Sequence, residues 1–371
     1  MDIFPRHPAR ILPYFGYRSR TRLTLTARAL RAREADFSGG GKWRAFRTML
    51  SQFASHEVAG LEVTLELERQ DGSKSRHPVT TDSEGFARWD IALSDGWELT
   101  RHTAWEVAAL HWSNDEGDHC VEGHIMAPGL DSHIAVISDI DDTIIETGIT
   151  GSFRALARNW RRVLAELPDE RLAVPGADLF YNALGGGHVK RAGEAAPGDR
   201  IPAMHRPFFY VSSSPWNLFS YLVAFKRARD LPLGPMMLRD WSFDRETLGS
   251  AGHGAHKRAS IEAICDTYPE MRFALIGDDT QGDLPAYAAV VGDNPGRIVA
   301  VFIRTSALEE PSSEERAAKA TIEAAGVPLW LGESYEIGQD FLKAAGLSQK
   351  GDTSRIVAVT DKKRNAAGAT D

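Results

Sequence analysis

Long apolar runs and cysteines are both scarce in this sequence of 371 residues. No segment approaches the ~18 uninterrupted apolar residues of a membrane-spanning helix, and residues 1–20 lack the apolar core of a signal peptide. The two cysteines, Cys120 and Cys265, are too few for a disulfide framework or a zinc cluster. We therefore expect a cytoplasmic protein in a reducing compartment, with both thiols buried.

Basic residues are also fewer than acidic residues in this sequence. The chain has 43 Lys and Arg against 51 Asp and Glu, a formal net charge of −8, which argues against a nucleic-acid-binding surface. Residues 1–33 are the exception, because Asp2 is their only acidic residue. Their basic residues are Arg6, Arg10, Arg18, Arg20, Arg22, Arg28, Arg31 and Arg33. This segment favours peripheral contact with an anionic membrane, and the alternative is a solvated face of a β-sheet.

The length favours two domains, since 371 residues exceed what one core usually serves. An apolar fraction of 43% and a charged fraction of 25% are those of a globular protein. We predict an N-terminal β-rich domain at residues 1–130 and a catalytic α/β domain at 131–345. The catalytic domain carries a cap or insert at 151–206, and a polar tail at 346–371 is predicted to be disordered.

The first third of the chain has the pattern of antiparallel strands. Apolar and polar residues alternate over 22–30 and 61–68, and Asp71-Gly72 then predicts a hairpin turn. Further strands are expected at 86–91, 105–112 and 120–126, and one helix is expected to carry Trp43, Phe46, Leu50 and Phe53. The pattern predicts an antiparallel β-sandwich or barrel.

From Asp131 the pattern changes to strands that alternate with helices. Buried strands are predicted at 134–138, 207–212, 236–239, 273–277 and 298–303. The predicted helices are 153–167 in the insert, one that Ser214-Pro215 opens and that ends near Arg229, and one that starts at Lys257. This order is typical of a parallel sheet with helices on both faces.

Four segments hold polar residues that a scaffold does not require. They are Asp139 to Thr143 after the first strand, Ser212 to Ser214 after the second, Lys257, and 277–283 after a later strand. Because the carboxyl ends of parallel strands share one edge of the sheet, we expect these segments to converge there. Each one alone has a structural explanation as a turn, a helix cap or a solvated residue, and their order along the chain favours function.

The residue types at this edge suit phosphoryl transfer. Clustered carboxylates bind Mg²⁺, while a serine hydroxyl and a lysine ammonium neutralise phosphate oxygens. One aspartate can attack phosphorus, and a second carboxylic acid can protonate the leaving alkoxide. The sequence contains neither a Walker A loop nor a recognisable Ser-His-Asp set, so it does not support ATP hydrolysis by that route or acyl transfer.

This ordered set resembles the motifs of the haloacid-dehalogenase-like (HAD-like) phosphatase superfamily. The segments SDIDDTI, HRPFFYVSSSPWNL, PMMLRDW, HKRASI and FALIGDDTQGD are more specifically similar to the Mg²⁺-dependent phosphatidate phosphatases related to the yeast actin-patch protein. The resemblance spans roughly residues 10 to 340 and implies a doubly wound, mainly parallel sheet preceded by a β-rich region.

The resemblance also implies roles for individual residues. Asp139 would be the nucleophile and a metal ligand, and Asp141 the general acid/base whose carbonyl faces Mg²⁺. Asp278 would be a direct ligand. The remaining roles are water-mediated metal binding by Asp279 or Asp283, phosphate binding by Lys257 with Ser212 or Ser213, and support of the loop by Thr143.

The predicted function is therefore Mg²⁺-dependent hydrolysis of a phosphomonoester through an aspartyl-phosphate intermediate. Phosphatidate, cleaved to diacylglycerol, is the first candidate substrate, because the resemblance points to a lipid phosphate. The basic start of the chain and Arg154, Arg158, Arg161 and Arg162 agree with a lipid. The alternatives are a phosphatase for a soluble phosphomonoester and a membrane- or protein-binding module whose phosphatase domain is silent.

Overall fold

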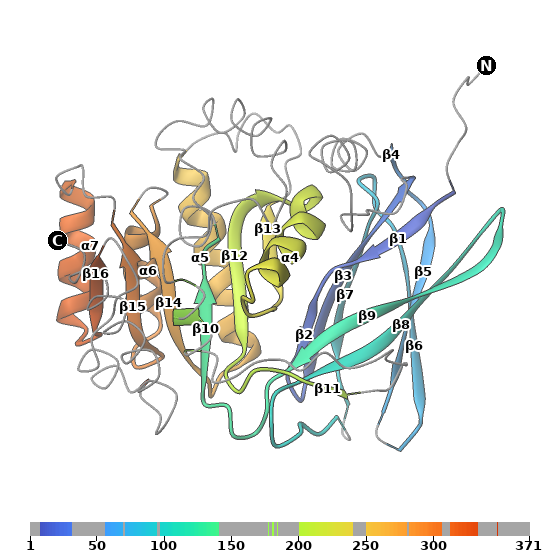
Figure 1. Cartoon of the computed structure of the whole chain (residues 1–371), viewed down its shortest axis with the longest axis horizontal. Coiled ribbons are helices and arrows are strands. Elements are labelled where there is room, and N and C mark those ends of the chain that lie inside the picture. The colour runs from blue at the N-terminus through green and yellow to red at the C-terminus, as the bar shows by residue number, and fades with distance from the viewer. Residues whose placement is uncertain are drawn as a thin grey trace, which may run out of the picture.

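The chain contains two β-sheets that stand side by side, the first at the right of Figure 1 and the second at the left. The computed structural model describes residues 8–31, 56–69, 71–94, 97–140, 177, 180–181, 184, 200–239, 250–279, 282–305, 312–332 and 347. The predicted helices at 43–53 and 153–167 and almost all of the predicted tail lie outside these residues. No helix among the described residues is both long and apolar enough to cross a membrane.

The first sheet has ten strands, and most of its pairs are antiparallel, as the alternating pattern predicts. Its strands are β1 (Arg10–Pro13), β2 (Gly16–Arg18), β3 (Arg22–Arg31), β4 (His56–Glu57), β5 (Glu62–Glu68), β6 (Lys74–Thr80), β7 (Phe86–Ala92), β8 (Ala104–Asn114), β9 (Gly117–Ala127) and β11 (Arg200–Pro202). The main path runs β1-β3-β2-β9-β8-β5-β6, and β2 with β9 is its parallel pair. Alternate residues such as Leu25, Leu65 and Leu110 meet in one core.

Two local predictions in this sheet have different outcomes. The Asp71-Gly72 turn joins β5 to β6, and Gly72 has a φ of 80°, a value that glycine adopts without strain. The prediction that both thiols are buried is wrong for Cys120, which is exposed on β9, whereas Cys265 is buried. The burial pattern of β9 explains this, because the residues around Cys120 point largely into solvent.

Several arginines near the start of the chain have acidic partners elsewhere in the N-terminal region. The pairs are Arg18–Glu106, Arg20–Glu98, Arg22–Asp90 and Arg28–Glu57. Arg18 is fully buried and binds both carboxylate oxygens of Glu106, at 2.5 and 2.6 Å. The charge of these four arginines is therefore matched within the first sheet.

The second sheet is parallel in every described pair, as the strand–helix alternation predicts. Its strands are β10 (Ile134–Ser138), β12 (Phe208–Pro215), β13 (Met236–Arg239), β14 (Arg272–Asp278), β15 (Ile298–Arg304) and β16 (Leu329–Gly332). Their order is β13-β12-β10-β14-β15-β16. The strand order reverses at β10, and ligands of such sheets bind at this switch point, outside the carboxyl ends of the strands.

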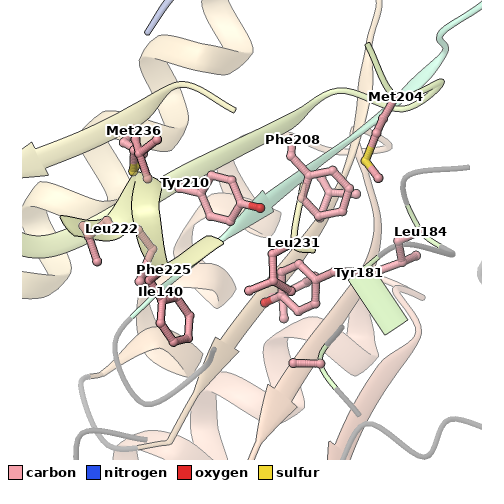
Figure 2. Packing of buried hydrophobic residues seen from close by; sticks show 14 of the residues in the cluster. Ile140, Tyr181, Leu184, Met204, Phe208, Tyr210, Leu222, Phe225, Leu231 and Met236 are labelled. Atoms are coloured by element: carbon pink, nitrogen blue, oxygen red, sulfur yellow. The ribbon is translucent and has the colours of Figure 1, made fainter. Parts of the chain in front are cut away.

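Helices cover both faces of the second sheet. They are the 3₁₀ helix Trp216–Leu218, α4 (Phe219–Ala228), α5 (Ser250–Thr267), α6 (Asp283–Asp293) and α7 (Ser313–Ala324). On one face Leu222 and Phe225 of α4 pack with Phe208 and Tyr210 of β12 (Figure 2). On the other face α5, α6 and α7 bury their apolar residues against β14 and β15.

Two predicted helix starts differ from the structure. Ser214 and Pro215 belong to β12, and Pro215, extended at φ −72° and ψ 154°, is the N-cap of the 3₁₀ helix that begins at Trp216 and leads into α4. The helical segment thus starts one residue later than predicted and ends near Arg229 as predicted. Lys257 lies in the interior of α5, which starts at Ser250. Glycines within α5 disfavour a helix by about 1 kcal/mol each relative to alanine, and the buried apolar side of the helix offsets this.

The two sheets share an apolar interface. Tyr17 of β2 packs edge-on against Phe209 of β12, with ring centroids 5.7 Å apart, and Tyr14 lies 4.4 Å from Trp216 by the same measure. The chain crosses between the sheets between β9 and β10, close to the predicted division at residue 130. Among the described residues it returns to the first sheet at β11, which lies in the predicted insert and pairs with β8. The division into independent domains stays a prediction.

Candidate active site

Three buried carboxylates meet at the switch point of the parallel sheet. Asp139 follows β10, Asp278 ends β14, and Asp283 opens α6. Because Ser138 pairs with Ile276 in the register of β10 and β14, the residues after them emerge at the same edge. One oxygen from each carboxylate lies within 4.8 Å of the others. The relative exposure of the three residues is 1% or less, so water does not screen their mutual repulsion.

Lys257 brings the compensating positive charge from α5. Its Nζ lies 3.1 Å from Oδ1 of Asp139 and donates a hydrogen bond to Oδ1 of Asp283. Burial alone would lower the pKa of Lys257, but the charges of Asp139, Asp283 and Asp278 outweigh it and raise the pKa above its usual value. The lysine is therefore held as an ammonium ion against two carboxylates.

Asp283 also acts as a brace, in the sense that its carboxylate accepts hydrogen bonds from two neighbouring groups of the site. Its Oδ2 accepts the backbone N–H of Asp278 at 3.1 Å, so one carboxylate holds both the end of β14 and Lys257. Burial raises the pKa of Asp283 to about 6, and the neighbouring Lys257 opposes this shift. Gly277 makes room for the arrangement, since a Cβ atom there would lie 2.8 Å from Cβ of Asp283.

The sequence left open whether Asp279 or Asp283 takes part in metal binding, and the two residues are placed differently in the structure. Asp283 belongs to the carboxylate group, whereas Asp279 is not part of it. The backbone N–H of Asp279 donates to the carbonyl of Arg304 at 3.0 Å, which continues the pairing of β14 with β15. Among the described residues, the candidate metal ligands are therefore Asp139, Asp278 and Asp283.

The three serines lie on β12, beside β10, and are buried. The register of β12 with β13 shifts between Val211 and Pro215, so the serines occupy an irregular stretch. Oγ of Ser212 accepts the backbone N–H of Ser214 at 2.9 Å, which fixes the local backbone. The choice between Ser212 and Ser213 as phosphate ligand stays open. Asp141 and Thr143 lie outside the described residues, which stop at Ile140 in this part of the chain.

Three side chains beside the site were given no role in the sequence analysis. Oγ of Ser138 donates to the backbone carbonyl of Asp139 at 2.5 Å and lies 2.7 Å from the hydroxyl of Tyr181. The hydroxyl of Tyr287 donates to the carbonyl of Ile276 at 2.8 Å, and burial together with the nearby carboxylates raises its pKa well above the usual value. Tyr287 is four residues after Asp283, so helical spacing was the signal that could have placed it.

The donor set fits a hard divalent cation. The three buried groups offer only carboxylate oxygens, which Mg²⁺ prefers, and no sulfur or imidazole atom belongs to this group. Three carboxylates also exceed the single charge of Lys257, so a divalent ion would balance the negative charge that remains in the buried space.

Comparison with known proteins points to the same region of the chain. Residues 134–305 match the family model described as phosphatidate phosphatase APP1, catalytic domain. Phosphatidate phosphatase APP1 of Saccharomyces cerevisiae is 32% identical over 186 residues, which cover 49% of this chain and 28% of the yeast protein. An uncharacterized protein of Schizosaccharomyces pombe is 24% identical over 229 residues, 61% of this chain and 34% of its own length.

These matches leave most of each relative without a counterpart, since the chain spans about a third or less of the curated relatives that it matches. Among solved structures, a β-glucuronidase of Bifidobacterium dentium aligns over 85% of this chain and 57% of its own, at 9% identity. Its TM-score of 0.23 is too low to inform the fold. The similarity that bears on the candidate site is therefore the one over 134–305, which contains all the site residues described above.

Proposed function

We propose that this protein is a phosphatase acting on phosphatidate. The premise is that residues 134–305 belong to the family of phosphatidate phosphatase APP1 catalytic domains. The observation that carries the proposal is the convergence of Asp139, Asp278 and Asp283 around Lys257 at the switch point of a parallel sheet. The sheet order and the helices on both of its faces support a HAD-like doubly wound fold for this region.

Asp139 is the proposed nucleophile. Lys257 lies 3.1 Å from its Oδ1, and an ammonium ion at that distance keeps a buried carboxylate ionised and able to attack. The attack joins a carboxylate oxygen to phosphorus and breaks the bond from phosphorus to the alkoxide. Asp141, two residues after the nucleophile in the sequence, is the proposed acid that protonates the alkoxide and then the base that activates water for hydrolysis of the aspartyl phosphate.

Mg²⁺ is the proposed cofactor, and Asp139, Asp278 and Asp283 would hold it. When bound, the ion supplies positive charge that offsets the negative charge of the carboxylates and of the phosphoryl group. Lys257, with Ser212 or Ser213, is proposed to neutralise the phosphoryl oxygens. Asp283 positions this lysine and the backbone of Asp278, so its contribution includes the alignment of other groups.

The lipid identity of the substrate rests on the name of the yeast relative. The arginines at 18, 20, 22 and 28 add little to it, since all four have acidic partners. A soluble phosphomonoester uses the same phosphoryl chemistry and is the second candidate. A silent phosphatase domain is disfavoured, because each position that the proposed mechanism uses within the described residues carries a suitable polar side chain. These side chains are Asp139, Ser212, Lys257, Asp278 and Asp283.

The test measures phosphate release from phosphatidate in mixed micelles and from a panel of soluble phosphomonoesters, each with Mg²⁺ and with EDTA. We expect release from phosphatidate that EDTA abolishes and that added Mg²⁺ restores. Release from the soluble compounds alone would remove the lipid assignment while keeping the phosphatase. Full activity in EDTA would contradict the metal, and no release from any substrate would favour a binding module.

A further inference from the structure

A second group of metal-ligating side chains lies at the opposite end of the parallel sheet. His102, Asp131 and His205 each offer one ligand atom, and these atoms all lie within 4.8 Å of one another. Asp131 precedes β10, whereas Asp139 follows it, so the two groups are separated by the length of that strand. Five residues of strand span about 16 Å. This group is therefore distinct from the candidate active site.

Two of the three residues, Asp131 and His205, come from segments through which the chain passes between its two sheets, and His102 lies in the connection from β7 to β8 within the first sheet. His102 precedes β8 of the first sheet, and Asp131 lies in the connection from β9 to β10. His205 lies in the connection from β11 back to β12. Residues that are far apart in the sequence thus meet where the two crossings run side by side.

Hydrogen bonds fix these segments against one another. The Oγ1 atom of Thr103 lies 2.8 Å from Oγ of Ser132 and donates to the carbonyl of His205 at 3.1 Å. The backbone N–H of Asp131 donates to the carbonyl of Arg101 at 3.1 Å. Thr103 and Ser132 are themselves buried. The backbone that carries the three ligands is therefore held in place by contacts that do not involve the ligand atoms.

The ligand atoms are arranged with one oxygen left unsatisfied. Nδ1 of His102 lies 2.8 Å from Oδ2 of Asp131. The other oxygen, Oδ1 of Asp131, is shielded from solvent and has no hydrogen-bond donor among the described residues. Leaving such an oxygen without a partner is unfavourable. The side chain of His102 is 71% exposed, so one side of the group is open to water.

We propose that His102, Asp131 and His205 bind a transition-metal ion of the Zn²⁺ class and that this ion clips the two sheets together. Two imidazoles and one carboxylate suit Zn²⁺, Co²⁺ or Ni²⁺ better than Mg²⁺, which prefers oxygen. Zinc ligands lie about 2.0–2.2 Å from the ion, which places the ligand atoms of a tetrahedral site about 3.3–3.6 Å from one another. Nδ1 of His102 and Oδ2 of Asp131, at 2.8 Å, must therefore move apart to admit the ion, and the exposed side chain of His102 has room to do so. Water takes the remaining position on the open side.

The test is equilibrium dialysis of the full chain against Zn²⁺ with Mg²⁺ in large excess, so that Mg²⁺ competes at the carboxylate site. We expect the wild type to retain one more equivalent of Zn²⁺ than His102→Gln and His205→Gln do. His133→Gln is the matched control, because His133 is exposed on the same connection and is not part of the group. Equal zinc content in the wild type and the two site variants would overturn the proposal.

Thermal unfolding gives a second readout that does not depend on activity. Zn²⁺ should raise the melting temperature of the wild type and of His133→Gln, since an ion that binds only the folded state stabilises it. Asp131→Asn keeps the size of the side chain and should melt near the wild type without metal but gain nothing from Zn²⁺. An equal gain in Asp131→Asn and the wild type would mean that His102 and Asp131 form only a hydrogen bond at the crossing.

Discussion

Lys226 on α4 is a buried lysine, and no salt bridge to it is present among the described residues. Its side chain is 1% exposed, and within the described part of the chain its Nζ has no hydrogen-bond partner. The Nζ atom lies 3.2 Å from the centroid of the Tyr210 ring, in the apolar cluster of Figure 2. Burial lowers the pKa of the Lys226 ammonium well below its usual value.

Two effects compete at this lysine. A cation over an aromatic ring gains about 2 kcal/mol when it is desolvated. Burial of an ammonium ion without a hydrogen-bonded partner costs several kcal/mol more than that. Desolvation therefore dominates, and folded Lys226 becomes a neutral amine at a lower pH than an exposed lysine does.

The neutral amine makes stability depend on pH in a defined way. Lys226 of the unfolded chain holds its proton up to a pKa of 10.5, whereas the folded chain releases it at a lower pH, so the free energy of unfolding falls as the pH decreases from 10.5 toward the folded pKa. The slope is about 1.4 kcal/mol per pH unit between the two pKa values.

Lys226→Met is the discriminating substitution, because methionine has a similar length and no charge. Urea unfolding of the wild type and the variant over a pH series that ends near the usual lysine pKa should show the variant to be more stable, by a margin that shrinks as the pH rises from the folded pKa toward 10.5. Lys319→Met on the exposed face of α7 is the control and should show no such trend. Parallel pH profiles for the wild type and Lys226→Met would refute the neutral amine.

Three further predictions concern the site and the first sheet. Asp139→Asn should lower phosphatase turnover by about 10⁴-fold or more with unchanged thermal unfolding, because it removes the proposed nucleophile; retained turnover would contradict that role. Gly277→Ala should displace the carboxylate of Asp283 and reduce turnover at saturating substrate, and an unaltered rate would show that Asp283 is not a brace. Arg18→Leu should lower the free energy of unfolding in urea by about 3–5 kcal/mol, since Glu106 loses a buried bidentate partner; a change under 1 kcal/mol would mean that water replaces the arginine.

The parallel sheet was the most predictable part of this fold. All five strands predicted after residue 131 are present, because strands buried on both faces read as continuous apolar runs. The sixth, β16, was not predicted, since its residues are only partly buried. The helix α7 before it was also missed, although Ser312 and Glu315 form a capping box that the sequence displays.

The candidate site was predictable only to the level of segments. Strand ends indicated where Asp139 and Asp278 would lie, since parallel strands deliver their last residues to one edge. The choice of Asp283 over Asp279 depends on where α6 begins, and the sequence does not fix a helix start to one residue. The group formed by His102, Asp131 and His205 has no spacing that a motif could reveal, because the crossing of the chain assembles it.

The strand β11 has a consequence for the order in which this protein can be completed during synthesis. It pairs with Ala104–Glu106 of β8, whereas β5 pairs with β8 only from Ala109 to His111. Until residue 202 has left the ribosome, that stretch of β8 keeps a row of backbone groups without a partner strand, and open edges of this kind recruit other chains. A fragment ending at residue 130 would retain that edge permanently. Most strands of the first sheet are therefore synthesised early, but its last strand, β11, can be added only after residue 202 has been made.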